Sequence, residues 1–210
     1  MIQCLTGLPG FGKTATVARM GYKALLEGRT VYSNFPLKGA IPYFDPLEVL
    51  GRVKNCLILM DEAGILLDQL KMFDMPYEIF YELRQHRKDG VDLLLTAQSL
   101  LDIAYTFRRL IQFEFRINSK IGRFVQVKCK DPQTGGDYGK NLWYLSDKVF
   151  EVYRSYYKVK PPSYLGVEAN AAFDVSPLLE APQPVDMATW LKGYFDFEKE
   201  MYRLGRSFAV

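Results

Sequence analysis

The stretch from Gly7 to Thr14, GLPGFGKT, has the spacing G-x-x-x-x-G-K-T, which is typical of a loop that binds phosphate groups. Its glycines let the backbone approach phosphate oxygens closely, and successive N–H groups at the start of a helix supply partial positive charge. We expect Lys13 to contact the β- and γ-phosphates of ATP, and the Thr14 hydroxyl to bind Mg²⁺. The predicted nucleotide-binding residues are Gly7, Leu8, Pro9, Gly10, Phe11, Gly12, Lys13, Thr14 and Ala15.

Two neighbouring carboxylates provide the second half of the predicted site. Asp61 and Glu62 directly follow an apolar run, CLILM, that indicates a buried strand. At the end of such a strand, Asp61 is expected to bind Mg²⁺ together with Thr14, and Glu62 to activate the water that attacks the γ-phosphate. A DE pair can also simply begin a helix, but its combination with the phosphate loop favours catalysis. Since the chain has no N-K-x-D guanine signature, ATP is preferred over GTP.

Gln98 ends a second apolar run, VDLLLTAQ, and is predicted to contact the γ-phosphate and the attacking water. The alternative is that it only turns the chain or caps a helix. Charge that builds up on the γ-phosphate also calls for an arginine, supplied by the same chain or by a neighbouring subunit. Arg84 and Arg87 precede the run, and Arg108 and Arg109 follow it; each could equally be a solvated helix charge. The predicted catalytic residues are Glu62, Gln98, Lys13, Arg84 and Arg87.

Alternating strands and helices must position these residues at one edge of a sheet. The predicted strands cover residues 2–6, 30–35, 56–60, 91–98 and 111–117, followed by an antiparallel pair at 122–130 and 140–145. The predicted helices cover residues 13–27, 46–52, 75–88 and 100–109, the third one capped by Asp74. This order predicts an α/β fold in three layers with a mainly parallel sheet, as in P-loop NTPases of the additional-strand type. In that fold the strand ending at Gln98 lies between the strands that precede Gly7 and Asp61.

The composition suits one α/β domain with an appendage, since 49% of the 210 residues are hydrophobic. The longest apolar run is CLILM, so we expect no membrane-spanning segment, no secretory signal and a soluble intracellular protein. Cys4, Cys56 and Cys129 each fall in a predicted strand, which favours buried reduced thiols over disulfides or a metal cluster. The single histidine, His86, argues against a zinc site and a histidine-based triad.

Positive charge is concentrated in residues 116–160. This block has 10 Lys and Arg against 4 Asp and Glu, a net charge of +6, whereas residues 1–115 have 13 of each. Such a block is the electrostatic pattern expected for DNA binding, and a merely solvated basic hairpin is the equal alternative. The candidate DNA contacts are Lys120, Arg123, Lys128 and Lys130.

The chain is expected to have three segments. These are a P-loop ATPase domain over residues 1–160, a proline-rich extended arm over residues 161–186, and an amphipathic helix over residues 187–210. The apolar stripe of that helix is expected to dock on the chain's own domain. Docking on a neighbouring subunit or on a membrane surface is the alternative.

Several motifs together resemble the zonula occludens toxin-like (Zot-like) ATPases of filamentous phages, from residue 1 to about residue 160. They are the N-terminal loop, GRTVYSN, LILMDE, HRKDGVDLLLTAQ and DKVFEVYRSYYKV. The family pattern reads approximately H-R-H-x-G-x-D-I-x-x-x-T-x-Q; His86, Arg87, Gly90, Asp92, Thr96 and Gln98 match it, while Lys88 replaces the second histidine. Because that family is related to the FtsK/HerA DNA-pumping motors, the resemblance implies a RecA/FtsK-HerA-like fold and a motor that uses ATP to move DNA during virion assembly, export or packaging.

Filamentous-phage members of that family usually carry a membrane-spanning segment after the ATPase domain, whereas this chain continues into the proline-rich arm. We therefore expect a homo-oligomeric ring, a hexamer or pentamer, that packages viral DNA. It would act in the host cytoplasm, with no transmembrane segment of its own, and reach the virion or membrane through viral capsid or membrane proteins. The alternatives are an assembly or export ATPase of a filamentous phage that extrudes single-stranded DNA, a small-molecule kinase, and a nucleotide-gated scaffold that moves nothing.

Overall fold

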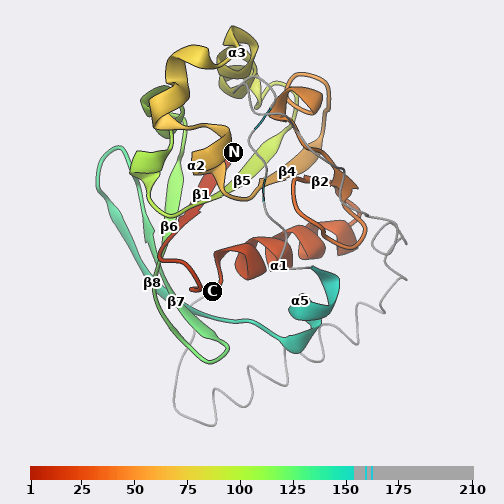
Figure 1. Cartoon of the computed structure of the whole chain (residues 1–210). Helices are drawn as coiled ribbons and strands as arrows, with labels where there is room; N and C mark the ends of the chain where they lie inside the picture. Colours follow the sequence, from red (N-terminus) through yellow and green to blue (C-terminus); the bar gives the residue numbers. More distant parts are fainter. Residues whose placement is uncertain (154–158, 160–161, 163–210) are drawn as a thin grey trace.

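The computed structural model describes residues 1–153, 159 and 162, and Figure 1 shows their arrangement. The predicted boundary at residue 160, the helix over residues 187–210 and, apart from residue 162, the arm over residues 161–186 lie outside the described residues.

Within the described residues, eight strands form one sheet in the order β3-β2-β4-β5-β1-β6-β7-β8. Neighbours from β3 to β6 are parallel, and β7 and β8 extend the sheet in antiparallel pairing. The predicted α/β fold with a mainly parallel sheet and an antiparallel extension is therefore confirmed. The strands are β1 Ile2–Thr6, β2 Thr30–Ser33, β3 Ile41–Pro42, β4 Cys56–Met60, β5 Asp92–Ala97, β6 Phe113–Ile121, β7 Phe124–Lys130 and β8 Asp137–Tyr144.

Helices cover both faces of the sheet and produce the three predicted layers (Figure 1). Strand β4 shows why: Leu57 and Leu59 belong to the core on the side of α1 and α5, whereas Ile58 and Met60 belong to the core on the side of α2, α3 and α4. A strand that is apolar at every position can be buried on both faces only in this way. The helices are α1 Lys13–Leu26, α2 Ala63–Leu66, α3 Tyr77–Gln85, α4 Tyr105–Arg108 and α5 Asp147–Val152, with short 3₁₀ turns η1 Pro46–Glu48, η2 Gln69–Asp74 and η3 Leu100–Asp102.

The register of three central strands determines where the site lies. Strand β5 is paired with β4 on one side and with β1 on the other, and all three run parallel. Met60 is opposite Leu95, and Thr6 is opposite Ala97, so these strands end close together at the same edge. The residues that follow them, Gly7, Asp61 and Gln98, therefore start from one edge of the sheet, as predicted.

Three predicted helices differ from the structure. The helix predicted over residues 46–52 is only the 3₁₀ turn η1, and the one predicted over residues 100–109 divides into η3 and α4. The division occurs because Ile103 and Ala104 have extended backbone, and the Ala104 N–H donates to the Leu67 carbonyl instead of continuing a helix. The predicted cap at Asp74 is wrong: Asp74 ends η2, and Pro76 is the residue that precedes α3.

The antiparallel extension is larger than predicted. Strand β6 is parallel to β1 on one side, but it continues to Ile121 and pairs antiparallel with β7 on the other, so it joins β7 and β8 in the extension. Sequence periodicity did not indicate the short elements β3, α2 and α5. The three cysteines are free and buried, as predicted. Among the helices of the described residues, none has both the length and the apolar character needed to cross a membrane.

Candidate nucleotide-binding site

The phosphate-loop sequence forms a tight loop between β1 and α1. Gly7 has a φ of +146°, and a Cβ at this position would lie 2.9 Å from the carbonyl oxygen of Ile117 in β6. Only glycine allows that close approach of loop and strand. The Gly7 N–H also donates to the Gln98 carbonyl, with an N–O distance of 3.2 Å. The start of the loop is therefore fixed against β5 on one side and β6 on the other.

The end of the loop presents the N-terminus of α1. Gly12 precedes the helix in left-handed conformation, with φ 86° and ψ 23°. No side chain caps this terminus, and the first turn contains no acidic residue. The first backbone N–H groups of the 14-residue helix and the positive end of its dipole are thus offered to an anionic ligand.

Lys13 is held inside the loop. Its side chain is 6% exposed, and its ammonium donates to the Gly7 carbonyl at 2.9 Å and to the Leu8 carbonyl at 3.3 Å. A buried ammonium requires such acceptors, because an unpaired one would carry a large desolvation cost. The predicted phosphate-binding lysine therefore lies within the loop, with its charge directed at the loop backbone.

Asp61 is the polar centre of the site. Thr14 Oγ1 lies 3.2 Å from Asp61 Oδ1 and 3.1 Å from Oδ2, and the Thr96 hydroxyl donates to Oδ1 at 2.5 Å. Asp61 itself is 7% exposed. Burial raises the pKa of its carboxyl above the ordinary value, while the hydrogen bonds from Thr96 and Thr14 and the charge of Lys13 oppose that rise. The structure thus brings together two residues that the sequence had paired, Thr14 and Asp61.

These two residues fit the predicted Mg²⁺. The ion prefers oxygen ligands, and here a hydroxyl oxygen and a carboxylate are adjacent at the mouth of a loop suited to phosphates. A divalent cation beside Asp61 would also counter the effect of burial, since a nearby positive charge stabilises the ionised carboxylate. Thr14 and Asp61 are therefore the residues that would hold the ion or its water ligands.

Glu62 has an unusual backbone. It lies in the left-handed region, with φ 51° and ψ 48°, directly before α2. Such a conformation costs a non-glycine residue about 1–3 kcal/mol and is typical of functional positions. The Glu62 N–H donates to Thr96 Oγ1 at 2.9 Å. Burial, and secondly the neighbouring Asp61 charge, raise the pKa of its carboxyl above the ordinary value, which makes the carboxylate a better proton acceptor.

Asn34 and Thr96 also belong to the candidate site, although neither of them was assigned a role from the sequence. Asn34, which follows β2 and is buried, accepts from the Asp61 N–H at 2.7 Å and donates to the Asp61 carbonyl at 2.9 Å. Thr96 in β5 bridges the Asp61 carboxylate and the Glu62 N–H. Both are polar residues at or just beyond the ends of strands next to β4, and that position is the signal that could have revealed them.

Gln98 lies where it was predicted, directly after β5 and beside the phosphate loop. Its side chain is exposed, and its backbone carbonyl accepts from Gly7. Its carboxamide is thus free to reach a ligand from the carboxyl edge of the sheet. The predicted contact with a γ-phosphate stays a prediction.

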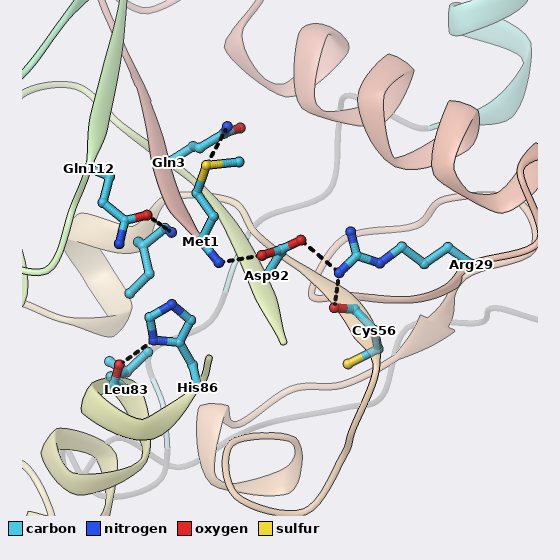
Figure 2. Close-up of polar contacts among 9 residues, drawn as sticks. Met1, Gln3, Arg29, Cys56, Leu83, His86, Asp92 and Gln112 are labelled. Carbon is cyan, nitrogen blue, oxygen red and sulfur yellow. Dashed lines mark hydrogen bonds and ion pairs between the residues drawn. The ribbon is translucent and has the colours of Figure 1, made fainter. Parts of the chain in front are cut away.

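Residues of the HRKDGVD segment lie at the opposite, amino-terminal edge of the sheet. Asp92, the first residue of β5, accepts from the Met1 amino group and forms an ion pair of 2.8 Å with Arg29 (Figure 2). Nearby, the buried His86 donates from Nδ1 to the Leu83 carbonyl at 2.7 Å (Figure 2). This part of the motif organises the start of the sheet.

Within the described residues, the four candidate arginines form no hydrogen bond or ion pair with the phosphate loop or with Asp61 of their own chain. Arg87 is exposed and lines a shallow pocket with Met1 and Asp92, across the length of β5 from Gln98. Six residues of strand span roughly 20 Å. Arg84 is exposed near the end of α3, whereas Arg108 and Arg109 lie over the ring of Tyr105. Arg87 could therefore reach a nucleotide only on another subunit.

The four candidate DNA contacts all lie on the antiparallel extension but have different partners. Lys128 forms an ion pair with Asp137 at 2.5 Å, and the Arg123 guanidinium lies 4.2 Å from the ring centroid of Phe150. Lys130 pairs in register with Asp137. Lys120 donates to the Gly10 carbonyl of the phosphate loop at 3.3 Å. Three of the candidates are thus arranged around β7, while the fourth contacts the candidate nucleotide site.

Solved structures of two other proteins share this fold. The N-terminal domain of zonular occludens toxin from Neisseria meningitidis is similar with a TM-score of 0.55 and 19% identity, covering 73% of this chain and 98% of that one. The genome-packaging NTPase B204 of Sulfolobus turreted icosahedral virus 2, solved with ATP-γ-S, is similar with a TM-score of 0.51 and 9% identity, covering 69% and 98%. No family model and no curated protein matches the sequence. The predicted resemblance is confirmed at the level of the fold.

Proposed function

We propose that this protein is a viral ATPase that hydrolyses ATP to move DNA, as a genome-packaging motor. The observation that carries the proposal is the convergence of the phosphate loop, the Thr14–Asp61 pair and the strained Glu62 at one edge of the sheet. Phosphate binding alone would need only the loop. The Thr14–Asp61 pair, followed at once by the Glu62 carboxyl with its raised pKa, supports hydrolysis as well.

In this proposal each residue of the site has a separate role in binding or hydrolysing ATP. The loop N–H groups and Lys13 bind the phosphates, and Thr14 with Asp61 holds Mg²⁺, which neutralises phosphate charge when bound. Glu62 takes a proton from a water molecule as that oxygen attacks the γ-phosphorus, and the bond to the β-phosphate oxygen breaks to release ADP and phosphate. Gln98 orients the water and the γ-phosphate. Asn34 fixes the backbone of Asp61 by two hydrogen bonds.

Assembly into a homo-oligomeric ring, a hexamer or pentamer, is part of the same proposal. Arg87, and near it Arg84, lie toward the edge of the sheet opposite the phosphate loop. An arginine placed there can complete a site only on a neighbouring subunit, where an inserted arginine accelerates hydrolysis by roughly 10³–10⁵. The excess of positive charge in the sequence of residues 116–160 supports DNA as the translocated partner. The ring would act in the host cytoplasm and would dock on viral capsid or membrane proteins.

The fold shared with a viral packaging NTPase supports packaging as the role. A second candidate, assembly or export of a filamentous phage with single-stranded DNA, is favoured by the likeness to the zonular occludens toxin domain. The two roles differ in the strandedness of the DNA that should stimulate hydrolysis.

The test is a measurement of ATP hydrolysis with double-stranded, single-stranded and no DNA, over a range of protein concentrations. We expect double-stranded DNA to stimulate release of phosphate, and the rate per subunit to rise with concentration as rings assemble. Stimulation by single-stranded DNA alone would favour export. Negligible turnover at high concentration with DNA would contradict an ATPase and leave a nucleotide-gated scaffold, and transfer of phosphate to a metabolite would indicate a kinase.

A further inference from the structure

The hairpin of β6 and β7 extends beyond the strand that leads into the phosphate loop. The last residue of β1, Thr6, is paired with Arg116, and β6 then continues to Ile121 beside the loop. Ile117 contacts Gly7 at the start of the loop, and Lys120 contacts Gly10 farther along. One side of the loop is thus lined by a strand from the basic block of the chain.

Lys120 differs from the other basic residues of this hairpin in its partner. Its side chain is exposed, and its ammonium lies 3.3 Å from the Gly10 carbonyl oxygen. Lys128 has its charge paired with Asp137 at 2.5 Å. Within the described part of the chain, Lys120 makes no ion pair with a carboxylate. Among these residues, its positive charge faces a neutral carbonyl of a loop whose sequence and backbone suit phosphate groups.

We propose that Lys120 binds a phosphate group of the nucleotide in its own subunit, together with Lys13. The inference rests on the proposed ATP binding and deepens it, because it assigns to the nucleotide a residue predicted from sequence to contact DNA. Lys13 contacts the Gly7 carbonyl and Lys120, from β6, contacts the Gly10 carbonyl, so both ammonium groups lie against the same loop. An ammonium facing phosphate forms a charge-assisted hydrogen bond, which is stronger than one to a neutral carbonyl.

The same position links the hairpin to the nucleotide. When phosphate replaces the Gly10 carbonyl as the partner of Lys120, the hairpin is attached to the ligand by a charged contact. Lys128 and Lys130 belong to the adjacent strand of that hairpin. A nucleotide bound in this way would contact the same hairpin that carries Lys128 and Lys130.

The experiment is a calorimetric titration of MgATP, without DNA, into the wild-type chain and into K120A, K120R and K140A. Lys140 is the matched control, since it is an exposed lysine of the same extension, on β8, with no place in the site. We expect K120A to raise the Kd for ATP about fivefold to twentyfold, K120R to stay within about twofold, and K140A to bind as the wild type does. Melting curves should show all variants folded, because both lysines are exposed.

Wild-type affinity in K120A, or an equal loss in K140A, would overturn the inference while leaving ATP binding intact. Loss of DNA affinity in K120A with unchanged ATP affinity would overturn it too, and would return Lys120 to the DNA surface. Failure of the wild type itself to bind MgATP would instead refute the proposed function on which the inference rests.

Discussion

At the scale of single residues, the site is organised around one buried carboxylate. The Asp61 side chain accepts hydrogen bonds from Thr14 and Thr96, and its backbone N–H donates to the Asn34 side chain while its carbonyl accepts from it. These contacts fix the carboxylate at the position where it can share a metal ion with Thr14. Glu62 is placed by the same network, since its N–H is bound to Thr96. The strain at Glu62 is thus maintained by the hydrogen bonds of its neighbours.

The Glu62 carboxylate is expected to act in the chemical step and not in binding. Glu62→Gln should therefore bind MgATP with unchanged affinity but hydrolyse it roughly 10²–10⁴ times more slowly, because the amide cannot accept the proton from water. Binding is measured by calorimetry and turnover by release of phosphate. Glu78→Gln, a neutralised acid in the first turn of α3, is the control and should hydrolyse ATP at the wild-type rate. Normal turnover in Glu62→Gln would exclude the assigned role.

The raised pKa of Asp61 predicts a dependence of stability on pH. A buried carboxyl whose pKa is raised is favoured in its protonated form, so its ionisation weakens folding as pH rises from the ordinary aspartate value of 3.8 through the raised value. Without nucleotide and Mg²⁺, Asp61→Asn should raise the melting temperature near pH 7, because the neutral amide avoids the cost of burying a charge. Thermal unfolding from pH 3 to 8 should show this gain disappear below pH 3.8. A lower melting temperature for the variant at pH 7 would be the contrary result.

At the scale of elements, the phosphate loop is positioned by the close packing of α1 on β4. Gly21 in α1 permits that packing: a Cβ there would lie 2.3 Å from Cδ1 of the fully buried Leu59 and 3.1 Å from Cδ2 of Leu37. Helix and strand thus approach more closely than any side chain larger than hydrogen would allow. The start of α1, and with it Lys13, is held by this contact.

Gly21→Ala should therefore destabilise the protein although alanine favours helix. The propensity gain is about 1 kcal/mol, whereas a methyl group forced into a packed core costs about 1–3 kcal/mol. We expect a net loss of up to about 2 kcal/mol in the free energy of unfolding, measured with urea. Lys23→Ala, at an exposed position of the same helix, is the matched substitution and should change stability by less than about 0.5 kcal/mol. An increase in stability for Gly21→Ala would show that α1 and β4 are less tightly packed than described.

Strands that are buried on both faces were the elements best predicted from sequence. The uninterrupted apolar runs of β4 and β5 correctly indicated the centre of a parallel sheet, and hence the common edge of Asp61 and Gln98. Periodicity failed where tertiary contacts decide the backbone. The split between η3 and α4 depends on the hydrogen bond from Ala104 to Leu67, and the roles of Asn34 and Thr96 depend on which strands are neighbours. None of these contacts is encoded by local spacing.

At the scale of the whole molecule, the two edges of the sheet hold different groups of residues. The carboxyl edge holds the phosphate loop, Asp61 and Gln98, and the amino edge holds the ion pairs of Asp92 (Figure 2). The antiparallel extension continues the sheet from the nucleotide site into the basic block (Figure 1). The proposed ring uses both edges: Arg87 would contact the nucleotide of one neighbouring subunit, and the arginine of another neighbour would contact the nucleotide bound here. The hairpin of β6 and β7 would then contact both the nucleotide and DNA.

The central claim is that the phosphate loop and the acidic pair bind a single nucleoside triphosphate and its metal. The most direct test is calorimetric titration of ATP, with and without Mg²⁺, into the wild-type chain, Lys13→Ala and Asp61→Asn. The account predicts one ATP per chain, an affinity at least about tenfold lower in Lys13→Ala, and a strengthening by Mg²⁺ that Asp61→Asn largely loses. Absence of ATP binding by the wild type, or an undiminished effect of Mg²⁺ in Asp61→Asn, would contradict it.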